Sequence, residues 1–353
     1  MTVPIALAAG VILTIPALGT NANEARGSFR QTNLVTDDQQ LAKAKFTDTN
    51  LKNPWGISSS RTSPMWVSDN NAGVTTLYTG NGTQITSIIV TIPPGHGSAQ
   101  GSPTGTVFNG NNTEFGGDRF LFATEDGTIA GWQGGSTAVT RVDNSTSTPS
   151  SVYKGLAIGF DGLADHIYAS NFGVGRVDVF NSDYSPAGSF TDPKVPDGYA
   201  PFNVQNLGGV LYVTFAKQNA VKHDDIAGRG HGFVDAFDLN GHLLDRLVSR
   251  GRLDSPWGLA IAPASFGALA GTLLVGNFGD GHINAYTLDE GDFKGALRSA
   301  NGSPIAIDGL WALRVGSGGG GASGDPRAVY FTAGINHEND GLFGTITNAG
   351  SGD

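Results

Sequence analysis

The stretch Ser255-Pro256-Trp257-Gly258-Leu259-Ala260-Ile261 decides the fold, because it repeats an earlier stretch, Asn53-Pro54-Trp55-Gly56-Ile57. After each of the two comes a second apolar segment that ends in polar residues, then a glycine and a third apolar segment. Four further copies of this pattern begin near residues 103, 152, 199 and 307, so the unit recurs about every 50 residues.

Each unit is predicted to be a blade of four short antiparallel strands. The alternation of apolar and polar residues in Arg176-Val177-Asp178-Val179-Phe180 is typical of strands, and no segment has a long helical period. The 53 glycines suit the tight turns that such strands need. Six units of about 50 residues therefore predict an all-β protein, a six-bladed β-propeller.

The chain outside the repeats sets the expected domain limits. We expect a signal peptide or N-terminal apolar segment at 1–23, an N-terminal segment at 24–52, the propeller at 53–348 and a tail at 349–353. The stretch 32–37 is a candidate for the outer strand that closes the sixth blade, because the chain ends soon after that blade's third strand. The alternative is a sixth blade without this strand.

The apolar run at 3–19, followed by small polar residues, resembles the apolar core and cleavage region of a secretory signal. It contains two prolines, and no Lys or Arg precedes Arg26. Either the real signal begins further upstream or the run is an uncleaved anchor. We expect an exported protein, periplasmic or extracellular, with no membrane span in the mature chain.

Composition excludes several classes of function. Lys and Arg number 21 against 31 Asp and Glu, a net charge of −10, and no basic run is present. This argues against nucleic-acid binding, which needs a concentrated basic surface. The chain has no cysteine, so disulfides, thiolate metal sites and a cysteine nucleophile are excluded.

The repeats resemble those of NHL-type six-bladed propellers, through the Pro-Trp-Gly entry strands and the Asn-Phe-Gly turns at 171–173 and 277–279. More narrowly, the chain resembles an uncharacterised family of exported bacterial propeller proteins. The stretches that carry this resemblance are 33–37, 53–56, 66–70 and 334–344, and it covers roughly residues 30 to 348. The resemblance implies a fold and export but no settled activity.

Polar residues follow the second strand of nearly every unit, and repeat equivalence should gather them at one end of the central channel. The alternative for each is ordinary turn chemistry, which Asn and Asp favour. We expect a channel mouth that meets a protein, a glycan or a small ligand, with these ligand-facing residues: Asp69, Asn70, Lys217 and Asn336.

Resemblance to six-bladed calcium-dependent lactonases implies Glu125, Asn171 and Asn277 as oxygen ligands of Ca²⁺ or Mg²⁺, by position in the repeat only. His337 is a candidate general base, with Glu338 or Asp340 holding its tautomer, and a solvated loop is the alternative.

A second candidate lies in the longest insertion inside a blade, between 217 and 231. Its His223-Asp224-Asp225 sequence offers groups that suit a metal or a substrate, and a flexible acidic loop is the alternative.

Two functions follow. The first is a binding or scaffold protein that performs no chemistry. The second is a metal-assisted, lactonase-like hydrolase or lyase at the channel mouth. The sequence has neither a Gly-x-Ser-x-Gly elbow nor a His-Glu-x-x-His zinc motif. It therefore favours the binding function over the enzymatic one.

Overall fold

The computed structural model describes residues 28–319 and 321–350. The predicted signal segment at 1–23 therefore lies outside the described residues, as do 351–353 of the expected tail. Among the described residues, no helix has the length and apolar character needed to cross a membrane.

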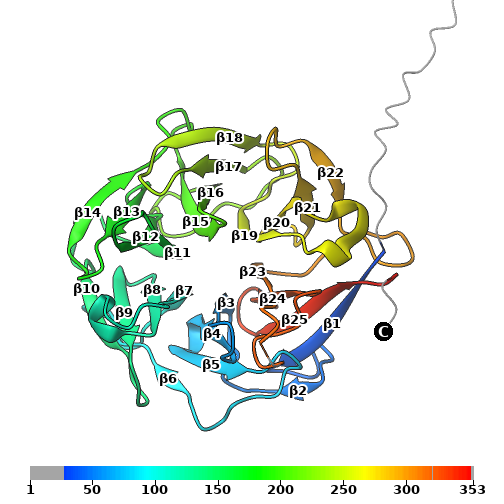
Figure 1. Ribbon diagram of the computed structural model, residues 1–353, viewed down its shortest axis with the longest axis horizontal. Helices are drawn as coiled ribbons and strands as arrows, with labels where there is room; N and C mark the ends of the chain where they lie inside the picture. The colour runs from blue at the N-terminus through cyan, green and yellow to red at the C-terminus, as the bar shows by residue number, and fades with distance from the viewer. Residues whose placement is uncertain (1–27, 320, 351–353) are drawn as a thin grey trace, which may run out of the picture.

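The strands form six sheets arranged in a ring around a central axis, which confirms the predicted six-bladed β-propeller (Figure 1). Neighbouring strands within each of the first five blades are antiparallel and consecutive in sequence. Blade 1 contains β3 (Pro54–Ser58), β4 (Met65–Asp69), β5 (Val74–Tyr78) and β6 (Val90–Thr91); blade 2 contains β7 (Pro103–Phe108), β8 (Phe120–Thr124), β9 (Thr128–Trp132) and β10 (Val139–Asp143); blade 3 contains β11 (Tyr153–Phe160), β12 (Asp165–Asn171), β13 (Arg176–Phe180) and β14 (Pro186–Phe190).

The remaining elements complete the ring. Blade 4 contains β15 (Tyr199–Leu207), β16 (Val210–Lys217), β17 (Gly232–Phe237) and β18 (Leu243–Ser249); blade 5 contains β19 (Pro256–Ile261), β20 (Leu273–Asn277), β21 (Ile283–Tyr286) and β22 (Phe293–Ala296); blade 6 contains β23 (Leu310–Val315), β24 (Val329–Ala333), β25 (Leu342–Asn348), β1 (Phe29–Thr36) and β2 (Phe46–Thr47). Three short 3₁₀ helices are η1 (Asn70–Ala72), η2 (Phe115–Gly117) and η3 (Ala264–Leu269).

The ring closes through the two ends of the described chain. Strand β1 pairs antiparallel with β25 from Phe29 opposite Asn348 to Thr36 opposite Leu342, and β2 adds a parallel edge outside β1. The Thr36 hydroxyl also donates to the Gly341 carbonyl at 3.1 Å. Strand β1, from the N-terminal side of the propeller, is therefore the fourth strand of blade 6. It overlaps the stretch 32–37 that was the candidate for closing this blade.

The innermost strands approach one another most closely at one repeated position. Gly56, Gly105, Gly155 and Gly258 occupy it in four blades, directly after the second residue of β3, β7, β11 and β19. A Cβ on Gly105 would lie 2.3 Å from the Leu156 nitrogen, and one on Gly56 would lie 2.6 Å from the Thr104 oxygen. Because the obstructing atoms are backbone, the neighbouring blade could yield only by moving its inner strand.

Aromatic side chains fill the channel just beside this position. The Trp55 and Trp311 rings stack with centroids 3.5 Å apart, and Trp257 meets both edge-on at 6.0 and 5.8 Å. The three tryptophans thus pack against one another from blades 1, 5 and 6. Phe202 joins them at 5.8 Å from Trp311. The channel is therefore closed by an aromatic plug, defined as Trp55, Phe202, Trp257 and Trp311.

Replacing Gly105 by Ala should destabilise the propeller by roughly 1–3 kcal/mol, because the added methyl group overlaps the backbone of β11. Urea unfolding followed by tryptophan fluorescence measures the change. Gly134→Ala is the matched control, since no atom lies within 4 Å of the added Cβ there. Equal stability of the two variants would show that the blades do not depend on this close approach.

Candidate functional site

A buried ammonium group lies at one end of the channel, above the aromatic plug. Lys154 is the second residue of β11, and its side chain is only 2% exposed. Its Nζ forms an ion pair with Glu125 Oε1, lies 3.5 Å from Asp224 Oδ1 and sits 5.0 Å from the centroid of the Trp55 ring. The carboxylates offset the cost of burying this charge, and the ring face adds a cation–π contact.

Glu125 links three blades at this end of the channel. It follows β8 directly, where the chain turns toward β9. Its Oε1 pairs with Lys154 of blade 3, and its Oε2 accepts a hydrogen bond from Asn70 Nδ2 of blade 1 at 2.8 Å. Both oxygens are thus held, so the carboxylate has a fixed orientation.

The long insertion between β16 and β17 folds back over the mouth. The Ile226 amide donates to the Lys217 carbonyl at 2.7 Å, and the Asn219 amide donates to the Asp224 carbonyl at 2.7 Å. This short hairpin places Asp224 beside Lys154. The loop that the sequence singled out is therefore built into the mouth.

The charged groups of the insertion differ in their surroundings. His223 Nδ1 lies 2.8 Å from Asp224 Oδ1, and this hydrogen bond lowers the pKa of Asp224 to about 2 and raises the pKa of His223. Burial raises the pKa of Asp225, whose Oδ2 is buried and has no hydrogen-bond partner among the described residues. Asp225 is therefore a carboxyl group with unused hydrogen-bonding capacity.

Glu338 reaches the mouth from the turn between β24 and β25. This turn is unusual, because Asn336, His337 and Glu338 all have left-handed φ values of 55°, 53° and 65°. Glu338 Oε2 accepts a hydrogen bond from Asn53 Nδ2 at 2.9 Å, and Asn53 Oδ1 accepts one from Trp311 Nε1 at 2.9 Å.

Burial raises the pKa of Glu338 to about 7. The negative charges of Glu125 and Asp225 act in the same direction, whereas the hydrogen bond from Asn53 and the charge of Lys154 oppose the shift. Glu338 can therefore exchange a proton near neutral pH.

We define the charged mouth by its six ionisable residues, which come from blades 2, 3, 4 and 6: Glu125, Lys154, His223, Asp224, Asp225 and Glu338.

Two of the other predicted mouth residues bond within their own blades. Asp69 is fully buried, and its Oδ2 accepts a hydrogen bond from the Thr76 hydroxyl at 2.7 Å. Asn336 is exposed and donates to Asp340 Oδ2 at 2.7 Å. His337 is also exposed, and neither its ring nor the Lys217 ammonium has a hydrogen bond or ion pair among the described residues.

The side-chain nitrogens of Asn171 and Asn277 donate hydrogen bonds to nearby groups, whereas Asn277 Oδ1 is buried and accepts none among the described residues. Asn171 Nδ2 donates to Asp178 Oδ2 at 2.8 Å, and its Oδ1 accepts from the Val152 and Val174 amides. Asn277 Nδ2 donates to the Arg252 carbonyl at 2.8 Å and to Asp280 Oδ1 at 2.9 Å.

Sequence reasoning missed Lys154, although its position carried a signal. Lys154 directly precedes the repeated inner-strand glycine, and it is the only charged residue at that position. From blade 1 to blade 6 the residues there are Trp55, Thr104, Lys154, Phe202, Trp257 and Trp311. These six residues lie on the inner strands, around the channel axis. A charged residue among them therefore indicates where ionisable groups from other blades can come together.

Glu125, His223 and Asp224 form a group that could hold a metal ion, with candidate ligand atoms that all lie within 4.8 Å of one another. Its two carboxylates and one imidazole provide fewer oxygens than the six to eight that Ca²⁺ usually takes. Lys154 already contacts both carboxylates. A divalent ion would therefore have to compete with the ammonium for the same oxygens.

No model of a known protein family matches the chain. Two uncharacterised proteins of Acanthamoeba polyphaga mimivirus, R648 and L690, are each 30% identical to it, over 322 and 323 residues. These alignments cover 86% of the chain and 77% and 82% of the viral proteins. Both relatives are viral, whereas the sequence resemblance implied a bacterial family.

Solved structures with the same fold include virginiamycin B lyase from Staphylococcus aureus, with a TM-score of 0.52, 12% identity and coverage of 91% of this chain and 99% of the lyase. A streptogramin B lyase gives a TM-score of 0.50 and 13% identity, with coverage of 90% and 97%. At this identity the likeness shows the propeller fold alone.

We expect the free energy of unfolding of the wild-type protein to fall between pH 5 and pH 8, and we expect the Glu338→Gln variant to show a smaller fall. The folded pKa of about 7 lies above the usual 4.5, so the native state holds a proton that the unfolded state releases between these values. The contribution of Glu338 to the unfolding free energy therefore falls as pH rises through this window, by roughly 1–3 kcal/mol. Urea unfolding at several pH values measures it. Exposed Glu290→Gln is the control, and an E338Q profile parallel to the wild-type profile would contradict the assignment.

Proposed function

The chain belongs to the same protein family as the mimivirus proteins R648 and L690, and on that premise we propose that it is a binding protein whose charged mouth holds a small ligand with a positively charged nitrogen. The observation that carries this proposal is the charge imbalance of the mouth. Glu125 and Asp224 contact the buried Lys154 ammonium, and Asp225 and Glu338 are near enough to interact with its charge, so that four carboxyl groups from three blades share one ammonium.

The carboxyl groups are unequally neutralised. Lys154 pairs with Glu125 and Asp224, and His223 with Asp224, which leaves Asp225 and Glu338 without a cationic partner at ion-pair distance among the described residues. Burial raises the pKa of both. A ligand ammonium placed between them would favour their ionised forms and form charge-assisted hydrogen bonds.

Two features support a ligand that reaches the mouth from solvent. The side chain of Asp224 is 60% exposed and that of His223 is 46% exposed, so the charged mouth has an open rim above a buried floor. The same insertion exposes Val221 (79%) and Ile226 (40%). These apolar side chains suit a ligand or protein segment that carries an apolar part beside its charge.

Export is part of the proposal. The apolar run at 3–19 supports a signal peptide and a periplasmic or extracellular location. The NHL-type assignment of the repeats rests on the Pro-Trp-Gly and Asn-Phe-Gly patterns. Mass spectrometry of the mature chain from its native host would locate the first residue and test cleavage.

A second candidate is an enzyme, a lyase or hydrolase that works at the same mouth. Glu338, with a pKa of about 7, suits a general acid or base, and Lys154 could stabilise an anionic group that develops in a substrate. In the metal-assisted form, Glu125, His223 and Asp224 would hold Ca²⁺ or Mg²⁺, and the ion would polarise a substrate oxygen.

Tryptophan fluorescence should report binding of 1,4-diaminobutane, because Trp55 lies directly below Lys154. Asp225→Asn and Glu338→Gln should each weaken binding about tenfold, whereas exposed Asp245→Asn should not. Binding should strengthen from pH 6 to pH 8, as Glu338 loses its proton. Equal binding of the uncharged 1,4-butanediol would contradict a cationic ligand, and binding of an oligosaccharide alone would favour a glycan.

The metal-assisted candidate predicts that Ca²⁺ or Mg²⁺ raises the thermal midpoint of chelator-treated protein. A concentration one hundred times the Kd adds about 2.7 kcal/mol. His223→Ala should abolish this shift, while His242→Ala, which removes an exposed histidine on blade 4, should keep it. A midpoint that neither ion changes would exclude the metal-assisted form and leave the binding function or metal-free acid–base chemistry.

A further inference from the structure

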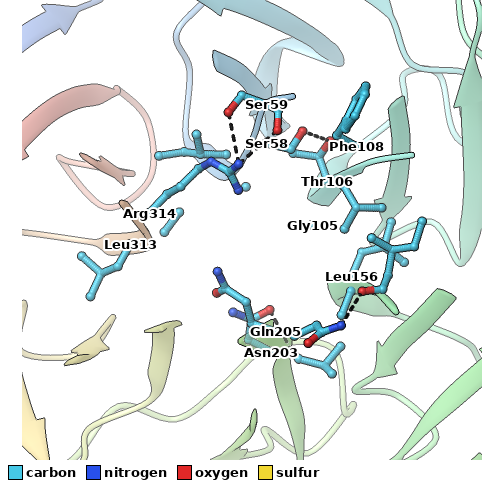
Figure 2. Close-up of a pocket in the computed structure, with 18 of the residues that line it drawn as sticks. Ser58, Ser59, Gly105, Thr106, Phe108, Leu156, Asn203, Gln205, Leu313 and Arg314 are labelled. Carbon is cyan, nitrogen blue, oxygen red and sulfur yellow. Dashed lines mark hydrogen bonds between the residues drawn. The ribbon is translucent and has the colours of Figure 1, made fainter. Parts of the chain in front are cut away.

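A second polar site lies at the opposite end of the channel, beyond the aromatic plug. The inner strands end here, and their last residues surround a cavity of about 190 Å³. Figure 2 shows the opening, with Arg314 of β23 and Gln205 of β15 both reaching into it. The cavity volume equals that of about six water molecules. Its size therefore suits a small molecule.

Arg314 gives this cavity a positive charge that no carboxylate balances. No acidic residue lines the cavity, and Arg314 has no ion pair among the described residues. Its Nη2 donates to the carbonyl and hydroxyl oxygens of Ser59, each at 3.1 Å. Its Nε is buried and has no hydrogen-bond partner among the described residues. Burial lowers the pKa of Arg314 to about 10, so the guanidinium remains charged at neutral pH.

Among the other polar side chains that line the cavity, two amides form hydrogen bonds within the protein and one does not. The amides of Asn203 and Asn206 donate to the carbonyls of Trp257 and Ile158, at 2.7 and 2.9 Å. Gln205, between them in sequence, has no side-chain hydrogen bond among the described residues. A ligand in the cavity would thus find a guanidinium and a free amide facing the same space.

We propose that this cavity binds a small organic carboxylate. Arg314 is half-buried with a buried Nε, and leaving such a charge unpaired is costly, so an anion that pairs with it relieves that cost. The guanidinium is planar and matches the two oxygens of a carboxylate, and its free Nε offers one of the donors. The apolar side chains of Val107, Leu156 and Leu313 also line the cavity and suit a short hydrocarbon part.

This anion site is independent of the charged mouth. The aromatic plug lies between the two, and Trp257 is the one plug residue that also lines the cavity. None of the six residues of the charged mouth lines it. A failure of either proposal therefore leaves the other unaffected, because the two use different residues and ligands of opposite charge.

Calorimetry and thermal unfolding of the full chain with butyrate test the proposal. Butyrate should bind with one-to-one stoichiometry and raise the thermal midpoint, whereas its uncharged analogue butyramide should bind at least tenfold more weakly. Arg314→Gln should abolish butyrate binding. Arg30→Gln should retain it, because Arg30 is exposed on β1, does not line the cavity, and is separated from β23 by β24 and β25 within the sheet of blade 6.

The Gln205→Leu variant keeps the test valid if R314Q fails to fold. It retains the charge and should weaken butyrate binding severalfold by removing the free amide. Butyrate binding by folded R314Q, or equal affinity for butyramide, would overturn the proposal. Binding of phosphate with no binding of butyrate would overturn the carboxylate class and identify an inorganic-anion site.

Discussion

The close approach of the six inner strands is the constraint on which the rest of this propeller depends. At Gly105 and Gly155 the backbone of one blade touches that of the next, and a single methyl group would collide with it. This contact fixes the radius of the ring, which in turn brings the residues just before the glycines within reach of one another. The stacked tryptophans and the buried Lys154 follow from that geometry.

The two ends of the channel have opposite electrostatic character. Above the aromatic plug, the Lys154 ammonium contacts the carboxylates of Glu125 and Asp224, and below it Arg314 lies among neutral amides and hydroxyls. Although the chain has a net charge of −10, no carboxylate lines the cavity beside the half-buried Arg314. The plug lies between these two regions, and each is formed by its own set of residues.

The repeats alone were sufficient to predict the six blades, and they also place Glu125 and Asn70 at the same end of the channel. Glu125 and Asn70 come together there because they occupy equivalent turns of adjacent blades. Asn171 and Asn277 occupy equivalent positions too, yet their side-chain nitrogens donate to Asp178 of β13 and to the Arg252 carbonyl, because repeat equivalence carries no information about side-chain direction. The fold-back of the insertion onto Lys154 depends on tertiary contacts, which no local pattern encodes.

The pairing of β1 with β25 has a consequence for how the protein is made. The Thr36 hydroxyl meets the Gly341 carbonyl across 305 residues of sequence. During synthesis, β1 emerges first and must wait for the last blade before it finds its partner. Such a long-range closure is slow to form and leaves an unpaired strand edge until translation is complete. A nascent or truncated chain therefore carries an open ring that can pair with other chains, and chaperone protection would matter most in that interval.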